Sequence, residues 1–87
     1  MTDAQILQEF EALADRMDIR VIRDNLEGRP GGFCTLRGER RFILDRSLDV
    51  STQVEIFARE FARIPLDDLY LVPRLRDRID AHREAPT

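Results

Sequence analysis

The segment that most constrains the fold is GRPGG, residues 28 to 32, where three glycines and a proline occur within five residues. Proline lacks the amide hydrogen that helices and central strands need, and glycine adds conformational freedom, so no regular element continues through the segment. It is not a phosphate-binding loop, because it lacks the Lys-Ser/Thr pair of such loops and the residues that follow it resemble a strand. The chain therefore changes structure here.

A β-hairpin is predicted directly after this segment. FCTLR and RRFIL flank Gly38 and Glu39, and glycine at the first central position favours a two-residue type II′ turn. Counting outward from that turn places Phe33 opposite Leu44 and Leu36 opposite Arg41.

Both faces of this hairpin carry apolar side chains. One face holds Phe33, Thr35, Phe42 and Leu44, and the other holds Cys34, Leu36, Ile43 and Arg41. A chain of 87 residues buries only roughly 60 to 65% of its surface, and few helices are available to cover both faces. We therefore expect a homodimer, formed through the Cys34, Leu36 and Ile43 face or through the segment from Tyr70 to Pro73.

Three helices are expected. Residues 3–17 show helical apolar spacing, and Thr2 and Gln5 form a capping box before it. A second helix begins at Ser51 or Thr52, with Thr52 capping it, and ends before Pro65. The third begins at Pro73.

A short β-rich run at residues 19–22 precedes the hairpin, so the predicted order is helix, strand, hairpin, helix, helix. We expect one α+β domain over residues 1–87, with two layers, an antiparallel sheet of about three strands and a hairpin at 33–44. No linker is expected, and the C-terminus should fray from about residue 84.

The charge balance argues against nucleic acid or a membrane surface as the main partner. All 14 basic residues are arginine, against 17 acidic residues, for a net charge of -3. Arg37, Arg40 and Arg41 around the hairpin turn leave nucleic-acid binding by a basic β-ribbon as an alternative. With one cysteine, an acidic N-terminal segment unlike a signal peptide and no long apolar run, we expect a cytoplasmic protein.

The FAREFAR motif at residues 57–63 lies in the second helix. At 100° per residue, Phe57 and Phe61 share the core-facing stripe, whereas Arg59 and Arg63 point away and Glu60 lies at the border. This spacing predicts an ordinary amphipathic helix with an exposed charged face.

The helix-strand-hairpin-helix order and the F-A-x-E frame resemble minimal zincin domains of the ImmA/IrrE type, in which the helix carries H-E-x-x-H. Arg59 and Arg63 stand at the positions of the two histidine ligands, and Glu60 stands at the position of the general base. Guanidinium cannot bind zinc, so the resemblance implies at most a pseudoenzyme or small hydrolase with a pocket near Glu60. The sequence is also similar to short uncharacterised bacterial proteins with a GGxCxLRG hairpin, which implies no activity.

Cys34 and His82 are the only candidates for a nucleophile and base. Cys34 in a strand is more simply a small buried apolar residue, and His82 extends the apolar stripe of the last helix. We expect no metal, cofactor or small-molecule ligand. The favoured function is a noncatalytic protein-interaction or regulatory module.

Overall fold

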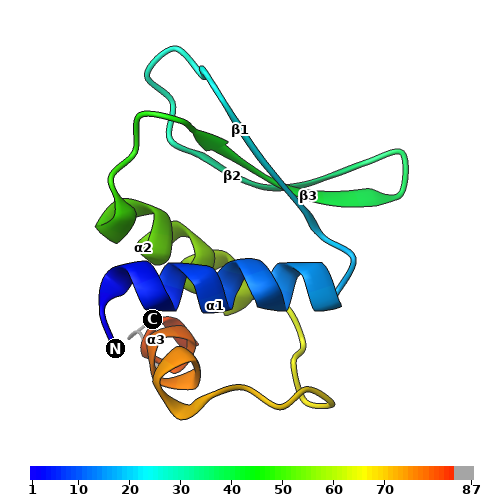
Figure 1. The fold of residues 1–87 in the computed structure, drawn as a ribbon. Helices are drawn as coiled ribbons and strands as arrows, with labels where there is room; N and C mark the ends of the chain where they lie inside the picture. The colour runs from blue at the N-terminus through cyan, green and yellow to red at the C-terminus, as the bar shows by residue number, and fades with distance from the viewer. Residues whose placement is uncertain (84–87) are drawn as a thin grey trace.

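The computed structural model describes residues 1–83, which form a sheet above two helices and a third helix below them (Figure 1). The helices are α1 (Asp3–Arg16), α2 (Val50–Phe61) and α3 (Pro73–Arg83), and the strands are β1 (Arg20–Asp24), β2 (Gly31–Leu36) and β3 (Glu39–Asp45). The predicted α+β class and element order are confirmed. The predicted frayed terminus lies outside the described residues.

The sheet is mixed, so the prediction of a purely antiparallel sheet is wrong. Its strand order is β1-β3-β2, with β1 parallel and β2 antiparallel to β3. Residues 25–30 cross the end of β3 and carry the chain from one edge of the sheet to the other. Backbone hydrogen bonds hold this crossing, from Asp45 N to Pro30 O (3.1 Å) and from Arg46 N to Asp24 O (2.9 Å).

The hairpin turn lies one residue earlier than predicted. Its central residues are Arg37 and Gly38, with φ angles of 54° and 80°, and positive φ at both positions is typical of type I′ turns. Phe33 therefore pairs with Phe42, not with Leu44. Because this shift moves the register by two residues, each side chain stays on its predicted face.

The predicted N-terminal cap is correct for α1 and wrong for α2. In α1 the predicted capping box is present, with Gln5 N donating to Thr2 Oγ1 (3.2 Å) and Thr2 N donating to Gln5 Oε1 (2.8 Å). In α2 the prediction of Thr52 as the cap is wrong. Asp49 caps the helix and accepts from Thr52 N at 2.8 Å, because aspartate is at least as good an N-cap as threonine.

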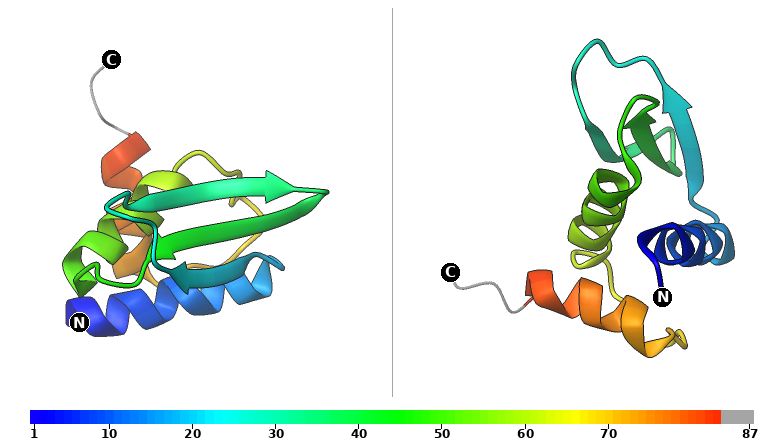
Figure 2. Two further views of the ribbon diagram at one scale, coloured as in Figure 1. Left: turned by 90° about the horizontal axis from the view of Figure 1, so that it is seen from above. Right: turned by 60° about the vertical axis from the view of Figure 1, so that its left-hand side comes forward.

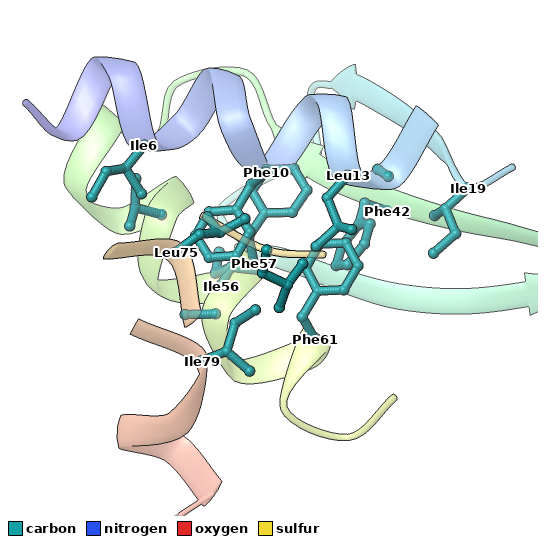
Figure 3. Close-up of a cluster of buried hydrophobic side chains, with 14 of the residues drawn as sticks. Ile6, Phe10, Leu13, Ile19, Phe42, Ile56, Phe57, Phe61, Leu75 and Ile79 are labelled. Atoms are coloured by element: carbon teal, nitrogen blue, oxygen red, sulfur yellow. The ribbon is translucent and has the colours of Figure 1, made fainter. Parts of the chain in front are cut away.

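Phenylalanine side chains from four elements connect the sheet to the helices, and Figure 3 labels those of α1, β3 and α2. Phe10 of α1 stacks on Phe57 and Phe61 of α2, with ring centroids 5.6 and 5.7 Å away. Phe42 of β3 lies 5.1 Å from Phe61, and Phe33 of β2 lies 5.3 Å from Phe42. The predicted core-facing stripe of α2 is thus confirmed, and all of this packing lies on one face of the sheet.

Candidate interaction surface

The opposite face of the sheet, called the outer face below, is not covered by any helix of residues 1–83. Seen from above, the strands lie nearest the viewer with no helix in front of them (Figure 2). Strand alternation places Ile22 of β1, Ile43 of β3, and Cys34 and Leu36 of β2 on this face. An exposed apolar sheet face of this kind is typical of a protein-protein interface.

Exposure of the outer face differs from one predicted interface residue to another. Leu36 is 52% exposed beside the hairpin turn. Cys34 is exposed, so the expectation of a buried cysteine is wrong, because β2 turns this side chain away from the helices. Ile43 and Ile22 are half-buried by their neighbours in the sheet, and neither packs against the hydrophobic core.

A depression of about 440 Å³ lies at the end of the outer face remote from the hairpin turn. It is lined by residues of the sheet and of the crossing loop: Asn25, Leu26, Glu27, Arg29, Gly31, Gly32, Cys34 and Ile43. The two glycines bring no side chain into it. The loop residues were not identified from the sequence, because only the unusual path across the end of β3 places them beside the sheet.

The crossing loop is attached to the sheet through the Asp45 carboxylate, which is buried. Asp45 Oδ1 accepts from Leu26 N at 2.8 Å, and Oδ2 accepts from the Ser47 hydroxyl and from Ser47 N. The Ser47 hydroxyl, followed by the Leu26 amide, lowers the pKa of Asp45 below its ordinary value of 3.8. Asp45 therefore positions Leu26 at the edge of the depression.

Charged residues on the outer face largely neutralise one another. Glu39 lies 3.5 Å from the Arg20 guanidinium and 3.3 Å from that of Arg41. Within residues 1–83, Arg41 Nε is the one buried side-chain nitrogen or oxygen without a hydrogen-bond partner. The outer face thus combines an apolar centre with charged side chains that pair with one another.

The three arginines of the predicted basic patch do not gather on one surface. Arg37 lies in the turn, and Arg41 pairs with Glu39 on the outer face. Arg40 lies on the helix side, where it donates to the Met17 carbonyl at the end of α1. One of the three arginines is thus used to cap a helix.

Glu60, the residue predicted to line a pocket, packs against the sheet. Its side chain is 13% exposed, and Oε2 lies 3.9 Å from the exposed Arg63 guanidinium. A Cβ atom added to Gly32 would lie 3.4 Å from Glu60 Oε1. Glu60 does not line the depression on the outer face.

Tyr70, the other predicted interface residue, lies far from the outer face. It is 72% exposed and belongs to residues 62–72, which run below the helices in Figure 1. Its carbonyl accepts from Arg16 at 3.1 Å, and its side chain lines a small depression of about 150 Å³ with Arg16 and Leu75. The two predicted interfaces are therefore separate surfaces.

Cys34 and His82, the candidate nucleophile and base, are not brought together. Cys34 belongs to the sheet, whereas His82 belongs to α3 on the far side of α1 and α2 (Figure 1). His82 Nε2 lies 2.6 Å from Glu55 Oε1 of α2. Within residues 1–83, no three His, Cys, Asp or Glu side chains are grouped closely enough to hold a metal ion.

The geometry defines a small α+β domain with one uncovered sheet face. Comparisons with protein-family models, curated proteins and solved structures found no match to the chain. No helix in the part of the chain that the structure describes has the length and apolar content of a membrane span. Function must therefore be inferred from the surface itself.

Proposed function

We propose that the chain is a noncatalytic protein-interaction module that forms a homodimer through the outer face of its sheet. The observation that carries this proposal is the outer face itself, to which every strand contributes apolar side chains and over which no described element packs. Burying that face against another chain removes apolar surface from water, which is the main driving force for association.

The expected dimer is weak. Three strands about 4.8 Å apart and about 20 Å long, together with the adjoining loop, present on the order of 400 Å² per copy. Such an area lies at the low end of specific interfaces, where complexes are transient. Measurements should therefore extend from about 10 to 500 µM, since micromolar dissociation constants correspond to weak complexes of this kind.

Sedimentation velocity over that concentration range tests the proposal. The wild type should show a concentration-dependent dimer, and Ile43→Glu should remain monomeric because the substitution places a charge at the centre of the face. Cys34→Glu changes an exposed residue and guards against misfolding of the Ile43 variant. Tyr70→Ser is the matched control, since it removes an exposed side chain from another surface. A wild type that stays monomeric at 500 µM would contradict the proposal.

The two alternative functions have less support. Glu60 contacts the sheet and Arg63, which gives no reason to propose a hydrolase. The hairpin arginines lie apart and two of them have partners within the chain, which gives no reason to propose nucleic-acid binding.

A further inference from the structure

The outer face has a protrusion at one end and a depression at the other. The protrusion is Leu36, a half-exposed side chain at the end of β2 beside the hairpin turn. The depression lies at the start of the same strand, beside Gly31 and Gly32, and Cys34 is the one β2 side chain among its lining residues. One strand thus carries both features on a single face: the Leu36 protrusion, called the knob below, and the depression, called the hole.

A two-fold axis that brings two such faces together must lie in the plane between them. If the axis runs along the strands, each hairpin turn lies over the other turn. If the axis runs across the strands, the strands of the two copies oppose each other in direction, and each turn lies over the depression of the other copy. Only the second arrangement places Leu36 over the hole.

Charge favours the same arrangement. The turn carries Arg37, and the rim of the depression carries one acid, Glu27, and one base, Arg29. Arg37 and Glu27 are exposed, and within residues 1–83 neither forms an ion pair. An axis along the strands would set Arg37 against Arg37, whereas an axis across the strands sets Arg37 against a rim of balanced charge that includes Glu27. Like charges at an interface disfavour the first arrangement, and the second arrangement lets Arg37 pair with Glu27.

We propose that a second copy of the chain occupies the depression, inserting Leu36 between Leu26 and Ile43 while its Arg37 meets Glu27. The proposal rests on the homodimer proposed above and specifies its geometry. The contact is isologous, so it occurs twice and closes at two subunits. Cys34 lies on β2 between Leu36 and the two glycines, at the edge of the depression, and the axis therefore passes close to Cys34 of both copies.

Charge reversal tests this geometry through partner choice. Arg37→Glu alone sets two acids against each other at both contacts, and Glu27→Arg alone sets two arginines against each other. Each variant should dimerise roughly tenfold more weakly than the wild type. Mixed together they should form a heterodimer of about wild-type affinity, because both contacts then join opposite charges. A differently tagged copy of each variant allows native mass spectrometry to count the three species.

A matched charge control and two further variants complete the design. Arg76→Glu, an exposed change on α3, should leave association unchanged. Leu36→Ala should weaken it at least about tenfold, since two leucine contacts are lost per dimer. Facing sheets lie about 10 Å apart and both Cys34 thiols point into that gap, so treatment with the thiol oxidant diamide should join Cys34 to Cys34 by a disulfide in the wild type and join far less of Leu36→Ala at the same concentration.

The results of these experiments distinguish a failure of the proposed dimer geometry from a failure of the proposed function. Preferred heterodimers and a Cys34 cross-link support it. If the wild type dimerises and Ile43→Glu does not, but the charge variants dimerise normally and do not prefer each other, the outer face is the interface and this geometry is wrong. If the wild type is monomeric, both proposals are overturned.

Discussion

Arg83 at the end of α3 should stabilise the fold by capping a different helix. The last carbonyls of a helix lack partners within the helix, and Arg83 donates to carbonyls at the end of α2 and just beyond it: Nε to Ala62 O at 3.1 Å, Nη2 to Phe61 O at 3.5 Å, and Nη2 to Ile64 O at 2.8 Å. The guanidinium also complements the negative end of the α2 dipole. Arg83→Ala removes all three contacts.

The expected loss is about 1 to 2 kcal/mol. Two well-formed hydrogen bonds to an exposed cation contribute roughly 0.5 to 1 kcal/mol each, and the third is too long to add much. A domain of this size has roughly 4 to 13 kcal/mol of total stability, so the variant stays folded and its unfolding can be measured. Thermal denaturation followed by circular dichroism should show a midpoint lower by about 5 to 15 °C.

Two further substitutions identify the cause of the loss. Arg83→Lys should recover only part of the stability, because an ammonium group cannot reproduce the planar fork of guanidinium. Arg76→Ala removes an arginine of the same helix that is exposed and should change stability by less than 0.5 kcal/mol. If Arg83→Ala is no more destabilising than Arg76→Ala, the proposed capping role is wrong.

Three other substitutions test the core, the turn into β2 and the crossing loop. Phe61→Leu should cost about 1 to 2 kcal/mol in urea denaturation, because Phe61 is fully buried against three rings; a loss below 0.5 kcal/mol would contradict that packing. Gly31→Ala should destabilise far more than Gly28→Ala, since both have positive φ but a Cβ atom on Gly31 would lie 1.9 Å from Ile43 O whereas one on Gly28 meets nothing; equal effects would refute the close approach. Asp45→Asn should flatten the acid limb of the stability curve. The pKa of Asp45 is lowered from 3.8, so its contribution is present above that pH and is lost as the pH falls through the lower folded-state pKa; an unchanged curve would show that the carboxylate does not hold the loop.

Features that depend on neighbouring residues were predictable from the sequence, and features that depend on distant pairing were not. The apolar spacing that buries Phe57 and Phe61 is local, and so is the capping box at Thr2. One glycine in the turn leaves two possible centres, Arg37-Gly38 and Gly38-Glu39, which explains the error in register. Both faces of the hairpin are apolar, and this alone indicated that one face would stay uncovered.

The features that could not be predicted from the sequence depend on long-range contacts. Nothing near β1 indicates that it pairs with β3 in parallel, because that pairing requires residues 25–30 to cross the sheet. The bonds from Asp45 to Leu26 and from Arg83 to α2 join residues 19 or more positions apart. The depression depends on this crossing, so the sequence indicated the outer face but not its knob and hole.

The central position of β3 also sets an order for folding. β3 is the last strand in the sequence, yet both other strands pair only with it, so neither can enter a sheet before β3 is available. The β2–β3 hairpin closes over a two-residue turn and should form within about 1 to 10 µs, whereas β1 must close a loop around the whole hairpin. The hairpin is therefore the template on which β1 docks. A substitution that slows hairpin formation should therefore delay the entire sheet, whereas a substitution in β1 should leave hairpin formation unchanged.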